Sequence, residues 1–259
     1  MYGVGGVGSV MVPSCSCFAS VTVETDELGD SHRSVAASTI GGVHVQFVTR
    51  KDRRSGKDSR MTYTIGPLEP ATWDAFVELV ERNNGIYGGC WCAPNHVEYE
   101  RGVSDPRTLK EELVRAGRAH AALVFDDDGV AQGWCQYGSP EELDLKHGRE
   151  YRKDPPPEAR WRVACIFVDK RHRGHGIARA ALEGALAEIA TAGGGLVEAI
   201  SETTTGRAVQ GRFLFSGTVE LFEEFGFACI RQVGKHAWIV SRMIDPVGPH
   251  GAGARRGTT

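Results

Sequence analysis

Apolar residues in the first half of the patterned sequence predict a short strand followed by two helices. Residues 63–65 have the composition of a strand. Apolar side chains then recur with the i, i+3, i+4, i+7 spacing of one helix face, which ends at Gly85: Trp73, Phe76, Val77 and Val80. Asp105 followed by Pro106 is typical of a helix start, because aspartate caps free amides and proline suits the first helical position.

The middle of the chain predicts strands that pair with one another. Two apolar runs, residues 121–125 and 130–137, flank Asp126 to Gly129, which has the composition of a tight hairpin turn. A polar loop over residues 139–158 follows. Residues 161–168 are predominantly apolar, so they predict a buried strand.

The last third predicts a long helix and a closing hairpin. One face of the helix is marked by Ile177, Ala178, Ala181, Leu182, Ala185, Leu186 and Ile189. A strand over residues 196–200, a short helix over 219–225 and a hairpin formed by 227–233 and 236–243 follow. Strands that alternate with helices predict an α/β fold with a mixed sheet.

The two ends of the chain lack such a pattern. Residues 1–60 combine a glycine-rich start with a basic stretch over residues 50–60, so we expect a disordered or loosely attached extension. Residues 61–244 then form a single domain, and the glycine, proline and arginine tail over 245–259 is expected to be disordered. Because the pattern starts at Met61, we hypothesise that translation begins there, which mass spectrometry of the native N-terminus would test.

Composition narrows the class of protein. The chain has 259 residues, of which 41% are hydrophobic and 24% charged, as in ordinary soluble domains. A net charge of -3 argues against a protein that binds duplexes by neutralising phosphates, although the basic stretch leaves nucleic acid as an alternative partner. No long apolar run predicts a membrane span or secretory signal, and the seven cysteines imply no disulfide framework. We therefore expect a soluble, cytoplasmic protein.

The segment with the clearest chemistry joins the strand ending at Val168 to the long helix. Gly174 and Gly176 allow a ligand to approach the backbone closely, and the first turn of the helix leaves amides free for an anion. Arg173 and Arg179 add the bidentate donors that suit phosphate oxygens, with Arg171 and His172 near the rim. The same residues are compatible with a plain tight turn and solvated arginines.

Two motifs resemble those of the GCN5-related N-acetyltransferases (GNAT). The residues from Arg173 to Ala178 are similar to the signature R/Q-x-x-G-x-G/A, and they follow a buried strand as in that family. Leu221 to Phe227 resembles the family's second motif, a helix that ends in Gly-Phe. The resemblance covers the order of elements over most of residues 61–244. It implies a mixed, mostly antiparallel central sheet that is splayed between its fourth and fifth strands and flanked by helices.

The resemblance also implies a ligand and a reaction. An acetyl group would pass from acetyl-CoA to a primary amine by direct attack in a ternary complex, without a metal. The diphosphate would lie on the amides from Gly174 to Arg179, and the pantetheine arm along Ile166 to Val168. The expected CoA-binding residues are Ile166, Phe167, Val168, Arg173, Gly174, His175, Gly176, Ile177, Ala178 and Arg179. A homodimer is common in the family.

The usual general acid of the family is missing. The position that often holds a tyrosine is Phe222, and the position that often holds an asparagine is Phe215. Ser216 and Thr218 lie nearby and could bond to the CoA sulfur, but each could instead cap the helix that follows. A non-catalytic acyl-CoA-binding or sensing domain is therefore an alternative to the enzyme.

For the base that deprotonates the amine, Glu198 is the first candidate. A half-buried carboxylate beside apolar neighbours would have a raised pKa suited to accepting a proton. The alternative is a strand residue that faces solvent or a basic side chain. Glu202 is the second candidate.

Residues 88–96 follow the first helix in the region that often borders the acceptor in this family. Tyr87, Trp91 and Trp134 are expected to wall an apolar pocket there, with His96 nearby. Cys90, Cys92 and His96 lack the spacing and the fourth ligand of a structural zinc site, so no metal is expected. A cysteine nucleophile is a further alternative. The sequence does not identify the acceptor amine.

Overall fold

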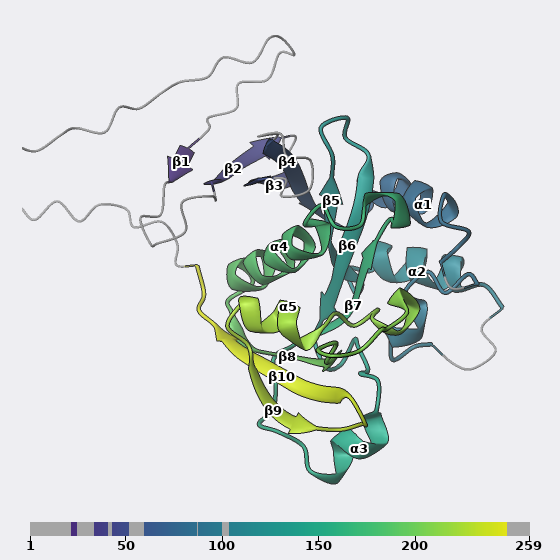
Figure 1. The fold of residues 1–259 in the computed structure, drawn as a ribbon. Helices are drawn as coiled ribbons and strands as arrows, with labels where there is room; N and C mark the ends of the chain where they lie inside the picture. The colour runs from purple at the N-terminus through teal and green to yellow at the C-terminus, as the bar shows by residue number, and fades with distance from the viewer. Residues whose placement is uncertain are drawn as a thin grey trace, which may run out of the picture.

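The computed structural model describes residues 22–24, 34–40, 43–51, 60–86, 88–99 and 104–247. One sheet runs through the chain in the order β1-β2-β3-β4-β5-β6-β7-β8-β10-β9 (Figure 1). Its strands are β1 Thr22–Glu24, β2 Ser34–Ile40, β3 Val43–Lys51, β4 Arg60–Pro67, β5 His120–Phe125, β6 Ala131–Gly138, β7 Trp161–Val168, β8 Gly195–Glu202, β9 Ala228–Gln232 and β10 Ala237–Ile244. All neighbouring pairs are antiparallel except β7 and β8, which are parallel.

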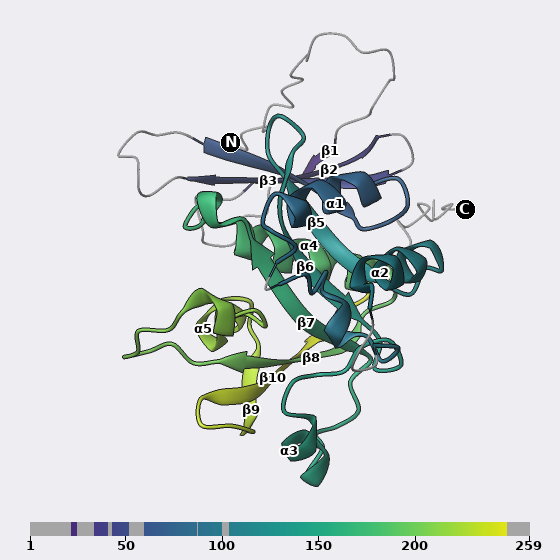
Figure 2. The same ribbon diagram turned by 90° about the vertical axis from the view of Figure 1, so that its right-hand side faces the viewer.

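Helices cover both faces of this sheet (Figures 1 and 2). The α-helices are α1 Trp73–Glu81, α2 Pro106–Arg115, α3 Gly148–Lys153, α4 Ile177–Thr191 and α5 Val219–Glu224, and the short 3-10 helices are η1 Ala93–Asn95, η2 Lys170–His172 and η3 Gly211–Phe213. Helices α1 and α2 pack on one face, and α4 and α5 on the other. Each face has its own apolar cluster, centred on Phe76 and Trp134 under α1 and on Leu182 and Phe222 under α4 and α5. In the described residues no helix is long and apolar enough to cross a membrane.

The helix starts follow from the residues that precede them. Asp105 accepts hydrogen bonds from the backbone N–H groups of Arg107 and Thr108, as predicted from its place before Pro106. Thr218 accepts one from the N–H of Leu221, so it caps α5. The amphipathic pattern of α1 is confirmed, because Trp73, Phe76 and Val80 are buried against the sheet.

The structure contains elements that the sequence pattern does not predict, among them the three 3-10 helices. Helix α3 lies inside the predicted polar loop. It has six residues and none of them is buried, so it shows no apolar period that a sequence pattern could reveal. Strands β1, β2 and β3 lie within residues 1–60, for which a disordered or loosely attached extension is predicted, and β3 pairs with β4. The domain boundary at Met61 stays a prediction, with β4 beginning at Arg60.

The predicted splay of the sheet is confirmed. Counted from β4, strands β7 and β8 are the fourth and fifth, and they pair only at Trp161 with Val197, Arg162 with Glu198, and Val163 with Ala199. Beyond Val163, β7 keeps its antiparallel partner β6 but leaves β8. We call the region between the C-terminal half of β7 and β8, where the two strands no longer pair, the wedge. The mixed, mostly antiparallel α/β fold is as expected.

We expect Phe76→Ala to destabilise the domain by about 3–5 kcal/mol, because this ring is fully buried between α1 and the sheet and its loss leaves a cavity. Asp74→Ala, an exposed position on the same helix, is the control and should leave the free energy of unfolding nearly unchanged. Urea unfolding followed by circular dichroism measures both. Equal effects of the two variants would contradict this packing.

Candidate active site

The turn between β7 and α4 presents unpaired backbone amides. Gly174 and Gly176 have φ values of 86° and 83°, in the left-handed region that glycine adopts without strain. The first hydrogen bond of the helix joins the N–H of Ala180 to the carbonyl of Gly176 at 3.0 Å. Among the described residues nothing accepts a hydrogen bond from the backbone N–H groups between Gly174 and Arg179. We call these six amides the amide cradle.

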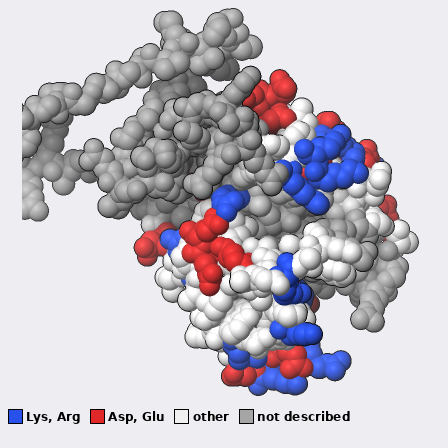
Figure 3. Space-filling model, in the orientation of Figure 1, with Lys and Arg blue, Asp and Glu red and all other residues white. Residues whose placement is uncertain are grey.

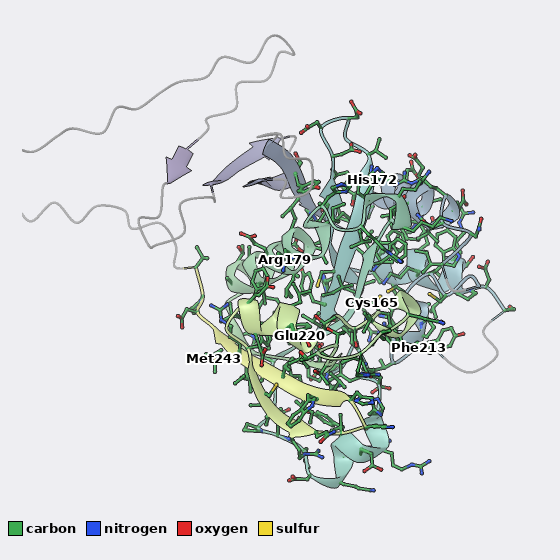
Figure 4. All side chains as sticks on the ribbon, viewed as in Figure 1. Cys165, His172, Arg179, Phe213, Glu220 and Met243 are labelled. Carbon is green, nitrogen blue, oxygen red and sulfur yellow. The ribbon has the colours of Figure 1, made fainter. Side chains whose placement is uncertain are left out.

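The charge around the amide cradle is positive. Lys170, Arg171 and Arg173 precede it, and Figure 3 shows basic side chains gathered over this turn. Figure 4 labels His172 and Arg179, between which the turn runs. Arg179 is already engaged, since its guanidinium bonds to the carboxylate of Glu224. Free amides at the start of a fifteen-residue helix, together with its dipole, form a site for an anion.

Two amides of β7 face the wedge. The N–H of Asp169 bonds to the carbonyl of Gln132 on the β6 side, and alternate residues of a strand point their N–H groups to opposite sides. The N–H groups of Ile166 and Val168 therefore point away from β6. The N–H of Ile166 donates to the carbonyl of Phe215 at 2.6 Å. The segment before α5 thus already occupies one donor that a ligand in the wedge would use.

Ser216 lies in this same segment. It is 2% exposed, its carbonyl accepts a hydrogen bond from Ser201 Oγ at 3.1 Å, and its own hydroxyl has no partner among the described residues. Thr218 caps α5, so Ser216 does not serve as the cap of this helix. Phe222 is fully buried edge-on against Phe227, so this position packs the core.

Glu198 is buried in an ion pair. It is 1% exposed, Arg162 Nε donates to it at 2.9 Å, and the Tyr151 hydroxyl donates to its two oxygens at 2.9 Å. These donors occupy both oxygens of the carboxylate. The sequence left open whether Glu198 lies beside apolar neighbours or faces solvent or a basic side chain, and the structure shows the basic side chain of Arg162. The catalytic role of Glu198 stays a prediction. Glu202 is bonded to Lys146 Nζ at 3.0 Å.

The residues expected to wall an acceptor pocket lie in the core. Trp134 is 1% exposed and stacks on Phe167 with ring centroids 4.6 Å apart, and Trp91 is 8% exposed against Trp73 and Phe76. The reason is that α1 closes over this face of the sheet and covers both indoles. Tyr87 lies outside the described residues. The binding roles of these residues stay predictions.

His96 belongs to a buried polar group that the sequence did not predict. Its Nε2 lies 2.8 Å from Lys110 Nζ and 2.9 Å from Gln136 Nε2, both of which are fully buried side chains. Burial, and then the nearby Lys110 charge, lower the pKa of His96 to about 2, so the ring is neutral. Because Nε2 of His96 accepts hydrogen bonds from Lys110 and Gln136, this nitrogen is not available to take a proton from a substrate.

Lys110 is held in this group by α2. Burial lowers the pKa of Lys110 to about 8, although the charges of Cys92, Cys165 and Cys90 act in the opposite direction. The only sequence signal for its burial is its spacing, three and four residues before Leu113 and Val114 on the inner face of α2. Figure 4 labels Cys165, which precedes Ile166 on β7. In the described part of the chain the cysteines are free, and no cluster of ligands that could hold a metal occurs.

Comparison with known proteins assigns the family. The model described as the acetyltransferase (GNAT) family matches residues 87–227, which is more than half of the chain. The chain therefore belongs to this family, and its class is that of an acyltransferase. Its matched range contains the amide cradle, the wedge and α5.

Solved structures with similar folds were also found, whereas a search of curated proteins found no match. They include the histone acetyltransferase HPA2 and related acetyltransferase of Corynebacterium glutamicum (16% identity over 72% of this chain and 98% of that chain, TM-score 0.43). A GNAT family N-acetyltransferase of Escherichia coli in complex with CoA has 15% identity over 73% of this chain and 84% of that chain, with a TM-score of 0.41. NAA60 of Arabidopsis thaliana in complex with acetyl-CoA has 15% identity over 70% of this chain and 99% of that chain, with a TM-score of 0.40.

We expect Lys110→Met to remove a pH dependence of stability. The pKa of Lys110 falls from 10.5 to about 8 on folding, so the unfolded state binds more protons between these values. The free energy of unfolding of the native protein should therefore rise as pH increases from about 8 to about 10.5, and stay low below pH 8.

Urea unfolding at several pH values in this range measures the effect, with the exposed Lys153→Met as the control. The rise should persist in the control and shrink in Lys110→Met. The same slope in all three proteins would show that Lys110 is not the titrating group.

Proposed function

We propose that this protein transfers the acetyl group of acetyl-CoA to a primary amine by direct attack in a ternary complex. The observation that carries the proposal is the pairing of the amide cradle with the wedge beside it. One offers unpaired donors at a helix start for a diphosphate, and the other is an opening in the sheet for the pantetheine arm and its thioester.

The contacts assigned to CoA are mainly those of the backbone. The amides from Gly174 to Arg179 bind the diphosphate, with Arg173 as a nearby cation. The pantetheine arm lies along Ile166 to Val168, where the peptide groups of β7 have lost β8 as a partner. A bound arm then satisfies backbone groups that a continuous sheet would have paired.

In the reaction the neutral amine attacks the thioester carbonyl, a C–N bond forms, the C–S bond breaks and the CoA thiolate leaves. Negative charge develops on the carbonyl oxygen, which the N–H of Ile166 can stabilise once the Phe215 carbonyl gives up that donor. Holding both reactants in line supplies several kcal/mol, on the order of 7 or more in favourable cases.

The proton steps are assigned to Ser216 and Glu198. The Ser216 hydroxyl is buried and has no partner among the described residues, which supports it as the donor to the thiolate. The amine loses its proton to Glu198, the first candidate from the sequence, with Glu202 as the second. A thiol pKa of about 8.5 makes the thiolate a tolerable leaving group.

The alternative function is a non-catalytic acyl-CoA-binding or sensing domain. It is favoured by one specific observation, the Phe215 carbonyl that occupies the Ile166 N–H, and by Phe222 at the position of the usual acid. Incubation with acetyl-CoA and a panel of amines, followed by detection of free CoA thiol, separates the two. Turnover with any amine dismisses the alternative.

We expect acetyl-CoA to raise the melting temperature of the native protein, and the double variant Gly174→Val, Gly176→Val to lose this shift. Side chains strain both left-handed positions and turn the amides away from the ligand. At a ligand concentration of about 100 times Kd the lost stabilisation is about 2.7 kcal/mol.

Gly206→Val is the matched control, because Gly206 also has a positive φ of 71° but lies in an exposed turn. This variant should lose stability yet keep the full shift with acetyl-CoA. An undiminished shift in the double variant would place the diphosphate elsewhere.

Ser216→Ala should lower kcat by about tenfold or more and leave the KM for acetyl-CoA nearly unchanged, because the hydroxyl acts only when the thiolate leaves. Thr218→Ala is the control for damage to the same segment. It removes the cap of α5, costs about 1 kcal/mol of stability and should leave kcat close to that of the native protein. An unchanged kcat in Ser216→Ala assigns the proton to solvent.

A further inference from the structure

Asp169 is a fully buried carboxylate between β7 and the amide cradle. Its side chain accepts hydrogen bonds from the turn that follows it, from the backbone N–H of Arg171 at 3.0 Å and from that residue's guanidinium at 2.7 and 3.1 Å. Its backbone N–H bonds to Gln132 on β6 at 2.9 Å. Asp169 therefore fixes the first residues after β7 relative to the sheet.

The remaining hydrogen-bond donors to the Asp169 carboxylate come from residues that are distant in the sequence. Arg82 Nε donates at 3.0 Å and Asn83 Nδ2 at 3.3 Å, both from the C-terminal end of α1. Arg82 also donates to the carbonyl of Ala131. Through its carboxylate and its backbone N–H, Asp169 thus joins the end of α1, the start of β6 and the turn before α4.

The charge of Asp169 is maintained by these donors. Burial alone would favour the neutral acid, but the hydrogen bonds from Arg171, Asn83 and Arg82 outweigh it and hold the pKa well below its usual range. A neutral amide in its place would accept fewer hydrogen bonds and would bring its own donors against two guanidinium groups.

We propose that Asp169 is the positioning residue of the amide cradle: it ties the turn to α1 and β6 so that the amides between Gly174 and Arg179 aim at the diphosphate of CoA. This inference rests on the proposed function. Asp169 itself touches no ligand and acts through the turn. The end of α1, which holds Asp169, thereby takes part in binding acetyl-CoA.

If the ion pair were purely structural, its loss would destabilise the whole domain and would affect catalysis with every acetyl donor alike. A positioning role is specific to the diphosphate, because only that part of acetyl-CoA would meet the cradle. S-acetylpantetheine carries the same thioester and arm without the diphosphate. A comparison of acetyl-CoA with S-acetylpantetheine therefore separates a positioning role from a purely structural one.

The experiment measures kcat/KM with acetyl-CoA and with S-acetylpantetheine for Asp169→Asn and Arg82→Gln, after thermal unfolding has shown that each variant is folded. For acetyl-CoA both variants should lose about tenfold or more, as expected for a broken hydrogen bond to a charged group. For S-acetylpantetheine both should change by about twofold or less. Glu78→Gln, which removes only the exposed partner of Arg82, is the matched control and should leave both donors unaffected.

Equal losses with the two donors, or no loss with either, overturn the proposal. If the native protein turns over neither donor, the proposed function fails and this inference is judged by binding alone. The Kd for CoA should then rise in Asp169→Asn and Arg82→Gln while the Kd for pantetheine does not. A CoA affinity equal to that of the native protein contradicts the positioning role.

Discussion

The candidate site depends on a change of partner along β7. Its first three residues pair with β8, and its remaining residues keep only β6. Peptide groups that leave a ladder inside a protein must find other partners, because an unpaired buried amide costs free energy. The chain meets this need at Ile166 with its own Phe215 carbonyl. Under the proposed function, the pantetheine arm would pair with the β7 groups that have no such partner.

Contacts with elements that are distant in the sequence stabilise the turn after β7. Its amides are free, so the turn itself contributes little that would keep them in place. The buried polar contacts of Asp169 with α1 and β6 supply the rigidity that the glycines do not. On the face of the sheet that α1 and α2 cover, the group around Lys110 and His96 stabilises the loop that follows α1. The carboxylate of Asp169, which accepts hydrogen bonds at both oxygens, favours one arrangement of the elements around the turn.

Much of this arrangement could be predicted from residue patterns. The predicted strand over residues 161–168 has the same bounds as β7, and Asp105 before Pro106 marks the start of α2, because both signals are local. Contacts made between distant segments could not be predicted. Lysine is ordinarily a surface residue, so nothing but its spacing hinted that Lys110 is buried, and the bond between Ile166 and Phe215 involves backbone atoms that every residue type shares. Ser216 and Thr218 were equal candidates for the cap until the start of α5 was known.

Under the proposed function, the Phe215 carbonyl accepts the hydrogen bond from Ile166 that the thioester carbonyl of acetyl-CoA would accept. A donor molecule entering the wedge exchanges one carbonyl for another, so its net gain at this point is the difference between two similar acceptors. Under the proposed function, most of the affinity for acetyl-CoA then comes from its diphosphate end, so the protein would select thioesters that carry a diphosphate.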